Sequence, residues 1–364
     1  MEPYSQIDIS QWTQVGEGGN GKTYVNQSRP GVILKVNKGH LSTYDAVMHE
    51  YEVSKGVESL GLSVPRMHEI ARVGDAYATI SQLIKNKKSL SRICHDEPGR
   101  TEEMARLLCE KGKELFATPC DTDFFPSRKV QALWAIDHAT FVCKKKRKVI
   151  RSFAEAIPED THCVHGDFQP GNLIQADGSH YWIDLDRFAY GDPMFDIGHL
   201  YLVCQVYSSM KRVQDIFHMT IDQFHAFWDA FAKAYTGKED HEEFDRQAGR
   251  FACIDVIVRT RFVPPSFMEK LFFWLLCTKA LQEILLTLLL ASVTTWAQNT
   301  FSGYGTGASY NPYLVSSVEH LIQLVNDVNN GNSYEGKYFE LTAVPSPAMW
   351  NRVLMFTIAR WLKP

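Results

Sequence analysis

The chain has 364 residues, of which 45% are hydrophobic, and a formal net charge of -4 at pH 7. A chain of this length can bury a large core and has room for two lobes or two domains. Its slightly negative charge gives no overall attraction to nucleic acid or to an anionic membrane, so the composition favours a small-molecule partner and argues against nucleic-acid and membrane partners.

The cysteines and the apolar segments indicate a cytoplasmic protein. The eight cysteines lie far apart without a C-x-x-C pair, which argues against a zinc site or a disulfide framework and fits a reducing compartment. The first ten residues, MEPYSQIDIS, lack the basic and apolar regions of a signal peptide. Residues 271–293 are the one candidate for a membrane span, but Lys279, Gln282 and Glu283 interrupt them, so we expect a buried helix of the larger lobe.

The first motif in chain order is a glycine-rich segment, VGEGGNGKTYV at residues 15–25, which fits two phosphate-binding patterns. In one pattern, residues 16–23 form a Walker A loop, which requires a helix directly afterwards. In the other, Gly16, Gly18 and Gly21 belong to a hairpin with a strand on each side. Turn residues between two β-type runs follow the segment, so we favour the hairpin.

A strand, a helix and further strands follow, and with the hairpin they predict a small antiparallel sheet with one helix. The strand GVILKV is rich in branched apolar residues and carries Lys35 near its end. Residues 42–59 are predicted to form the helix, and residues 61–84 a turn and two strands. The polar stretch KNKKS at residues 85–89 is the predicted boundary between two lobes.

From residue 90 to residue 157 the pattern is helical, with a polar cap expected at Thr101. The basic run CKKKRKVIRSF at residues 143–153 is interpreted as the solvated face of a helix rather than as a nucleic-acid site. The larger lobe is therefore predicted to be mainly helical.

Residues 163–186, CVHGDFQPGNLIQADGSHYWIDLD, set oxygen-bearing side chains at spacings suited to phosphoryl transfer. The segment is typical of a short strand, a loop tightened by Pro-Gly, and two strands joined by the turn ADGS. Asp167, Asn172 and Asp184 then meet at the mouth of one hairpin. Hard oxygen ligands suit Mg²⁺, which takes few protein ligands, and a carboxylate that does not hold the metal is free to accept a proton.

HGDFQPGN followed by YWIDLD resembles the catalytic signature of the aminoglycoside phosphotransferase and choline kinase superfamily, small-molecule kinases with the fold of protein kinases. The resemblance implies that Asp167 is the catalytic base, that Asn172 and Asp184 bind the metal ion, and that His165 has a supporting role. It is clear from about residue 12 to residue 200. HGD in place of HRD, IDLD in place of DFG and the lack of an APE segment make a peptide acceptor less expected.

The same resemblance implies a nucleotide site in the first lobe. The glycine hairpin and Lys35 would contact the phosphates of ATP, and a helix glutamate would hold Lys35, with Glu50 the best partner and Glu52 the alternative. The backbone of residues 82–84 would read the adenine edge. The cofactor-binding residues predicted in this way are Gly16, Gly18, Gly21, Lys35, Glu50, Gln82, Leu83 and Ile84.

Two aspartates near the motif have roles that the sequence leaves open. GDPMFD at residues 191–196 is similar to the family's GDP-x-x-D segment, whose aspartate bonds the backbone of the catalytic loop. Asp196 is therefore predicted to support that loop, although a helix N-cap would explain it equally well. Asp186 is predicted either to touch a second metal ion or to face the acceptor.

Residues 200–298 are expected to border the acceptor, and they are rich in aromatic side chains. Such side chains suit a quaternary ammonium or a sugar ring, or else belong to the core, whereas acidic side chains suit a cationic acceptor. The aromatic residues are Tyr207, Phe227, Trp228 and Trp274, and the acidic ones are Asp186, Asp222 and Asp255. The histidines His218, His225 and His241 share no metal-ligand spacing and are interpreted as packing or surface residues.

Together these features predict an α+β, protein-kinase-like bilobal fold with a small antiparallel-sheet N-lobe and a larger, mainly helical C-lobe. The predicted parts are the N-lobe at residues 1–84, a hinge at 85–89, the C-lobe at 90–300, and a helical extension packed on the C-lobe at 301–364. The predicted function is transfer of the γ-phosphate of ATP, with Mg²⁺, to a hydroxyl of a small aminoglycoside-, choline- or sugar-like molecule.

Two other function classes stay open. One is a nucleotide-binding module without transfer. The other is a metal-dependent phosphohydrolase, whose ligands would be His162, His165, Asp167, Asp184 and Asp186. The metal content of the purified protein separates the classes, because such a hydrolase would retain a transition metal whereas a kinase binds Mg²⁺ weakly with nucleotide.

Overall fold

The structure is a computed structural model of the whole chain, and it describes residues 4–17 and 21–260 together with short stretches after residue 296. Those stretches are residues 297–298, 308–309, 311–315, 320, 323–324, 333–334 and 337–341. Gly18, Trp274 and the buried helix expected at residues 271–293 lie outside the described residues. The chain divides into two compact units, residues 1–280 and residues 281–364.

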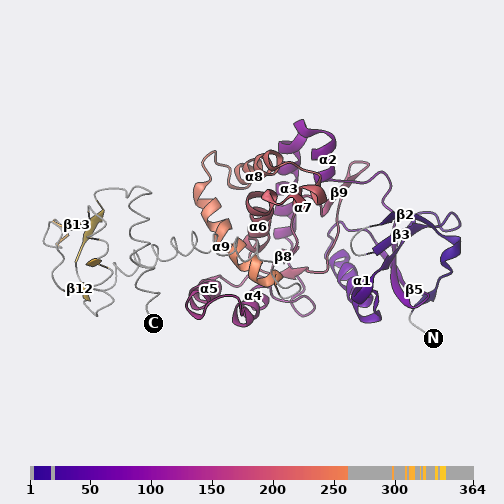
Figure 1. Cartoon of the computed structure of the whole chain (residues 1–364), viewed down its shortest axis with the longest axis horizontal. Coiled ribbons are helices and arrows are strands. Elements are labelled where there is room, and N and C mark those ends of the chain that lie inside the picture. Colours follow the sequence, from indigo (N-terminus) through magenta and orange to yellow (C-terminus); the bar gives the residue numbers. More distant parts are fainter. Residues whose placement is uncertain are drawn as a thin grey trace. The chain divides into compact units, whose positions relative to one another are not determined.

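The N-lobe is built on a mixed sheet that has six strands among the described residues, in the order β1-β5-β6-β4-β3-β2 (Figure 1). Its strands are β1 (Ser5–Gln6), β2 (Thr13–Glu17), β3 (Gly21–Val25), β4 (Val32–Asn37), β5 (Met67–Val73) and β6 (Ala76–Gln82). Neighbouring strands are antiparallel except β1 and β5, which run parallel, a pairing that the sequence did not predict. Leu34 of β4 and Ile80 of β6 pack with Trp12 in the buried core of this lobe.

The N-lobe helix is α1 (Tyr44–Ser59). It begins where Thr43 adopts an extended backbone and its hydroxyl oxygen accepts a hydrogen bond from the N–H of Ala46. Val47 and Val53 are among its buried residues, and the helix packs against β5 and β6. The packing places one face of α1, and the side chains on it, next to the sheet.

The C-lobe is mainly helical, as Figure 1 shows. Its described α-helices are α2 (Leu90–Asp96), α3 (Thr101–Phe116), α4 (Arg128–His138), α5 (Lys144–Ala156), α6 (Met194–Tyr201), α7 (Lys211–Phe217), α8 (Ile221–Thr236) and α9 (Glu242–Arg259). The chain also forms a π-helical turn and short 3₁₀ turns, which are η1 (Ile9–Gln11), η2 (Gly39–Ser42), η3 (Pro98–Arg100), the π-helical η4 (Leu202–Val206) and η5 (Tyr207–Ser209). Within the part of the chain that the structure describes, no helix is long and apolar enough to cross a membrane.

The ends of two C-lobe helices show how local sequence sets their bounds. Thr220 and Gln223 form a capping box at the start of α8, which ends at Gly237 in the left-handed conformation, with φ of 69°. The cap expected at Thr101 is wrong. Thr101 is the first helical residue of α3, and its hydroxyl donates to the carbonyl oxygen of Pro98, so the side chain closes the preceding turn instead.

Helices α6 and α9 pack closely, and glycine makes this possible. A Cβ added to Gly198 of α6 would lie 2.5 Å from the Cβ of Phe251 of α9, so any larger residue would push the helices apart. The close packing brings His199 of α6 beside Asp255 of α9, with Nδ1 and Oδ2 2.9 Å apart.

Short strands carry the segment at residues 163–190. They are β8 (Cys163–Val164), β9 (Leu173–Ala176), β10 (Ser179–Trp182) and β11 (Ala189–Tyr190), and β7 (Lys88–Ser89) from the hinge region pairs with β9. β9 and β10 are antiparallel and are joined through Asp177 and Gly178, whose φ angles are 46° and 79°. Positive φ at both central residues is the requirement of a tight hairpin turn, which is why the sequence carries Asp-Gly there.

In the second unit the structure describes two strand pairs. β12 (Ala297–Gln298) is antiparallel to β14 (Ser333–Tyr334), and β13 (Tyr313–Val315) is parallel to β15 (Phe339–Leu341). Strands thus occur in a region expected to be helical. The expected boundaries at residues 84, 89 and 300, and the packing of the extension on the C-lobe, stay predictions.

Candidate active site

Strands β2 and β3 form the glycine-rich hairpin. A Walker A loop would need a helix directly after Thr23, but β3 begins at Gly21 and continues past Thr23, paired with β2, so the Walker A alternative is wrong. Gly16 lies on β2, and Gly18 lies outside the described residues. A Cβ added to Gly21 would lie 2.4 Å from the carbonyl oxygen of Val36 in β4, so strand packing alone already requires glycine at this position.

Lys35 on β4 pairs with Glu50 on α1. Its Nζ lies 2.8 Å from Oε1 of Glu50, and Nδ2 of Asn37 donates to the other carboxylate oxygen at 3.1 Å. Glu52, the alternative partner, is exposed. The structure thus brings together the lysine and the glutamate that the sequence put first.

The lysine is electrostatically coupled to the residues that follow β10. Although desolvation opposes the charged form, the carboxylates of Glu50, Asp184 and Asp186 raise the pKa of Lys35. The predicted phosphate-binding lysine of the N-lobe therefore lies within electrostatic reach of the predicted metal-binding aspartate of the C-lobe.

The backbone of residues 82–84 is already partly used within the lobe. Gln82 and Leu83 both donate their N–H groups to backbone carbonyl oxygens, each at 2.8 Å. The side chain of Ile84 is buried beside Ile174. If this segment reads an adenine edge, the N–H groups of Gln82 and Leu83 are therefore already used.

Asp167 and Asn172 are joined in the loop between β8 and β9. Nδ2 of Asn172 donates to the backbone oxygen and to Oδ2 of Asp167, each at 2.9 Å. These bonds use the amide nitrogen, so the amide oxygen is the atom that remains to bind a metal ion. The Asp167 side chain is 25% exposed, whereas Asn172 is buried, which leaves the carboxylate partly open to a substrate.

Asp184 and Asp186 follow β10 and are both exposed. Asp184 has a φ of 57°, a left-handed conformation that is uncommon for a residue other than glycine. Desolvation raises the pKa of Asp186, and the carboxylates of Asp167 and Asp184 add to this against the charge of Arg187. The two exposed aspartates therefore lie within electrostatic reach of each other and of Asp167, an arrangement that favours a cation nearby.

His165 and Asp196 hold the loop between β8 and β9 from the buried side. The Asp196 carboxylate accepts hydrogen bonds from the backbone N–H groups of His165 and Gly166, at 2.5 and 2.8 Å. Asp196 lies inside α6, whose N-cap is Pro193, so the N-cap explanation for it is wrong. Nε2 of His165 lies 3.0 Å from the carbonyl oxygen of Ile183, which ties the loop to the residue before Asp184.

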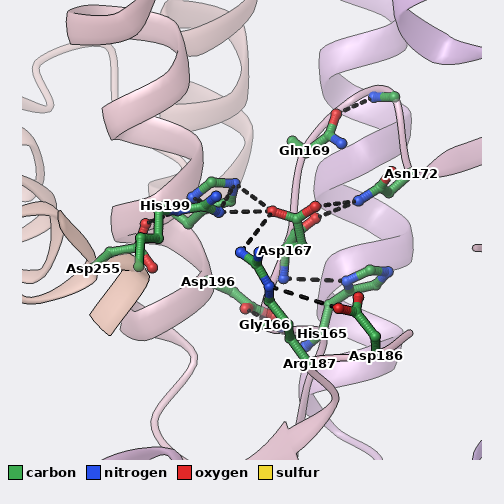
Figure 2. A network of polar contacts seen from close by, with 12 residues as sticks. His165, Gly166, Asp167, Gln169, Asn172, Asp186, Arg187, Asp196, His199 and Asp255 are labelled. Atoms are coloured by element: carbon green, nitrogen blue, oxygen red, sulfur yellow. Dashed lines mark hydrogen bonds and ion pairs between the residues drawn. The ribbon is translucent and has the colours of Figure 1, made fainter. Parts of the chain in front are cut away.

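His199 of α6 contacts the carboxylate of Asp167 from the side opposite Asn172 (Figure 2), and Arg259 of α9 contacts the same carboxylate oxygen. Nη2 of Arg259 donates to Oδ1 of Asp167 at 2.7 Å, and Nε2 of His199 lies 3.2 Å from the same oxygen. Asp255 lies behind both: its Oδ2 accepts from Nε of Arg259 at 2.8 Å and lies 2.9 Å from Nδ1 of His199. We call His199, Asp255 and Arg259 the Arg259 network.

The charges around Asp167 keep it ionised. Although burial opposes ionisation, the hydrogen bond from His199 and the charges of Arg259 and Arg187 hold the pKa of Asp167 well below its usual range. Burial also opposes ionisation of Asp255, but the charges of Arg259 and His199 lower its pKa as well. Asp167 is therefore a negatively charged hydrogen-bond acceptor at neutral pH.

Comparison with known families identifies the chain. Residues 11–244, more than half of the sequence, match the phosphotransferase enzyme family (APH). The chain belongs to this family. A search of curated proteins finds no match to the sequence.

Solved structures show the fold of this phosphotransferase. Aminoglycoside phosphotransferase APH(4)-Ia aligns with a TM-score of 0.51 and 15% identity over 75% of this chain and 93% of that chain. A thermostable mutant of that enzyme, in a ternary complex with ADP and hygromycin B, aligns with a TM-score of 0.50 and 16% identity over 75% and 94% of the two chains. A choline/ethanolamine kinase family protein from Mesorhizobium loti aligns with a TM-score of 0.49 and 13% identity over 75% of this chain and 92% of that chain. The APH(4)-Ia structures and the family match confirm the α+β, protein-kinase-like fold and the family resemblance expected from the sequence.

Sequence reasoning missed His199 and Arg259 of this phosphotransferase altogether and gave Asp255 a different role. One signal was present in the sequence. Asp255 stands inside the apolar run FACIDVIV, four residues before Arg259. A charged residue inside such a run is seldom buried without a partner, so the pair could have been read as part of a buried site.

The expectation that Asp255 suits a cationic acceptor is wrong. Asp255 is 3% exposed, and its two carboxylate oxygens already contact Arg128, Arg259 and His199. Such a carboxylate cannot reach an acceptor without breaking buried ion pairs. Asp222, by contrast, is exposed on α8.

The aromatic residues of α8 belong to the core. Phe227 and Trp228 are 0% and 2% exposed, so they cannot cage an acceptor, and the alternative that they pack in the core is confirmed. Tyr207 is partly buried, and Trp274 lies outside the described residues.

The histidines behave as packing and surface residues. His218 ends α7 in the left-handed conformation, and His241 contacts Asp229 and Asp245. Among the residues that the structure describes, no group of three His, Cys, Asp or Glu side chains could hold a metal ion. The ligand set required by the phosphohydrolase alternative is therefore not assembled there.

Proposed function

We propose that this phosphotransferase moves the γ-phosphate of ATP to a hydroxyl group of a small molecule, with Asp167 as the base and with Mg²⁺ held by Asn172 and Asp184. The observation that carries the proposal is the joint placement of Asp167 and Asn172. One amide nitrogen binds the base, and the oxygen of the same amide remains for a cation.

The donor side of the reaction falls to Lys35, Asn172 and Asp184. Lys35, held by Glu50, would contact the α- and β-phosphates. The Asn172 amide oxygen and the exposed Asp184 carboxylate are hard oxygen donors and few in number, which fits Mg²⁺. The chemistry that Mg²⁺ supplies when bound there is the neutralisation of charge on the phosphate oxygens.

The acceptor side falls to Asp167. The acceptor O–H bond breaks and its proton passes to the Asp167 carboxylate, while the hydroxyl oxygen forms a bond to the γ-phosphorus. The bond from that phosphorus to the bridging oxygen breaks, and its electron pair stays on ADP. Because the charges around it stabilise Asp167 as a carboxylate, it mainly orients the hydroxyl and takes the proton late, which suits the loose transition state of phosphoryl transfer.

The acceptor class stays within aminoglycoside-, choline- or sugar-like alcohols. Asp186 is exposed beside Asp167 and Asp184, so it is the carboxylate placed to meet a cationic group on the acceptor or a second metal ion. Aminoglycosides and choline carry such cations. The relative APH(4)-Ia was crystallised with hygromycin B, which supports placing an aminoglycoside among the first compounds to test.

The test is an ATP-consumption screen over aminoglycosides, choline, ethanolamine, sugars, methylthioribose and homoserine, repeated with Asp167→Asn. With the acceptor found, the variant should lose about 10²- to 10⁴-fold in kcat while its affinity for Mg·ATP stays near wild type, because the base acts on the acceptor proton. Asp137→Asn is the matched control, because Asp137 is an exposed aspartate of α4 that pairs with Arg151 at the surface.

Two outcomes would contradict the proposal. A kcat near wild type for Asp167→Asn would show that Asp167 is not the base. Binding of Mg·ATP without consumption over the whole screen would favour a nucleotide-binding module instead.

A further inference from the structure

Among the described residues, the contacts of the Asp167 carboxylate leave one of its hydrogen-bond positions for a substrate. A carboxylate offers about four hydrogen-bond positions, two on each oxygen. Oδ1 is occupied by Nη2 of Arg259 at 2.7 Å and by Nε2 of His199 at 3.2 Å. Oδ2 takes one bond from Nδ2 of Asn172 at 2.9 Å, so the open position is on Oδ2, beside the amide that is proposed to bind the metal ion.

Arg259 is itself fixed by a buried partner. Its Nε donates to Oδ2 of Asp255 at 2.8 Å, four residues earlier on α9, while Oδ1 of Asp255 lies 3.4 Å from the buried Arg128. The guanidinium therefore bridges two carboxylates through two of its nitrogens, a geometry that its planar fork allows and that an ammonium group cannot copy.

We propose that Arg259 is a positioning residue for the base. With His199 it occupies Oδ1 of Asp167, so that the acceptor hydroxyl can meet only Oδ2, on the Asn172 side. This inference rests on the proposed function, since it needs Asp167 to be the base. It gives Arg259, at the end of α9, a role in the reaction, although Arg259 lies outside the sequence motifs.

The consequence is a single approach for the acceptor. A hydroxyl on Oδ2 lies next to Asn172, where the γ-phosphate is held in the proposed mechanism, and a hydroxyl on Oδ1 would point toward α6 and α9 instead (Figure 2). Without Arg259 the carboxylate could rotate and take the hydroxyl on either oxygen. Misplacement of about 1 Å in such a geometry costs roughly 10²-fold in rate.

The test uses three variants of the full chain. Arg259→Met removes the charge and the fork, and Arg259→Lys keeps a charge for Asp255 but cannot bridge to Asp167. Arg246→Met is the matched control, because Arg246 lies on the same helix and bonds the surface residues Glu242 and Glu243.

The first measurement does not require turnover. It is isothermal titration calorimetry of Mg·ATP with the wild type and the three variants. Because Arg259 contacts Oδ1 of Asp167, on the side away from Asn172, the affinity for Mg·ATP should stay near wild type in all three variants.

The second measurement is steady-state ATP turnover with the acceptor from the screen. Arg259→Met should lose about 10- to 100-fold in kcat with KM for Mg·ATP near wild type. Arg259→Lys retains a charge partner for Asp255, so it keeps the test valid if the methionine variant does not fold.

The outcomes separate this inference from the proposed function. If kcat of both Arg259 variants stays near wild type, or if the loss falls on the affinity or KM for Mg·ATP rather than on kcat, the positioning role is overturned. If Asp167→Asn retains its turnover, the proposed function fails first, whatever the Arg259 variants do.

Discussion

Two basic residues meet carboxylates in this phosphotransferase, and their surroundings differ. Lys35 and Glu50 form a pair whose side chains are 31% and 22% exposed, while in the Arg259 network Arg259 is 25% exposed and Asp255 and His199 are 3% exposed each. The N-lobe pair is open enough for Lys35 to turn toward a phosphate. The C-lobe set, which we call the enclosed set, is closed on its inner side by the buried Asp255 and His199, so Arg259 is held from behind before any substrate arrives.

The difference fits the roles proposed for Lys35 and Asp167. A lysine that binds phosphates needs a free ammonium group with mobile donors, and a single glutamate suffices to hold it. A base must present one oxygen in one direction, which requires bonds to the other oxygen from rigid elements. Here those bonds come from α6 and α9, whose close packing depends on Gly198.

The largest expected effect in the enclosed set is on stability, through Asp255→Asn. The substitution keeps the shape but leaves Arg128 and Arg259 without their buried counter-charge, which should lower the free energy of unfolding by about 3–5 kcal/mol. The measurement is urea unfolding. The control is Asp215→Asn, which breaks an exposed pair with Lys211 and should cost about 0–1 kcal/mol. An equal loss in the free energy of unfolding for the two variants would show that Asp255 does not stabilise the fold as a buried counter-charge.

A smaller effect is expected in the open pair, and it appears in binding. Lys35→Ala should weaken Mg·ATP binding by about 10- to 100-fold, since a hydrogen bond to a charged group contributes about 1.5–3 kcal/mol. Lys22→Ala should change the affinity for Mg·ATP by less than about fivefold. The Lys22 side chain is 39% exposed, and its Nζ lies 3.7 Å from Oε2 of Glu17 in a surface pair. Isothermal titration calorimetry measures both. The reverse order would show that the lysine of the glycine-rich segment, and not the strand lysine, binds the phosphates.

The open pair and the catalytic loop were within reach of sequence reasoning because their parts are close in the chain. Asp167 and Asn172 are five residues apart, and Lys35 and Glu50 are separated by one strand end and part of one helix. Strand and turn patterns were enough to place Asp167 near Asn172. For Lys35 the patterns gave the strand and the helix, and the family resemblance supplied Glu50 as its partner.

The enclosed set was out of reach because its parts are distant in the chain. Arg259 and Asp167 are 92 residues apart, and His199 and Asp255 are 56 apart. Their meeting depends on how α6 packs on α9, which periodicity alone does not specify. For the same reason Phe227 and Trp228 could not be assigned to the core or to an acceptor site. Aromatic residues at helical spacing give the same sequence pattern whether they face the core or a ligand.

The smallest expected effect comes from a second histidine between two aspartates. His241 lies 3.1 Å from Asp229 through Nε2 and 2.9 Å from Asp245 through Nδ1, so it repeats the residue types of Asp167, His199 and Asp255 away from the catalytic loop. Although desolvation opposes protonation, hydrogen bonds to Asp229 and Asp245 raise the pKa of His241.

A raised pKa in the folded state means that the protonated histidine stabilises the fold at low pH. This contribution is fully present below the unfolded value of about 6.5 and is lost as the pH rises through the folded value. Replacement by His241→Gln should therefore cost about 0.2–1 kcal/mol at pH 6 and less at pH 9, as for a partly exposed ion pair. Urea unfolding of wild type and variant at the two pH values measures the difference. A cost that grows with pH would mean that the histidine contributes by packing, and that a histidine between two aspartates does not by itself form an ionic set.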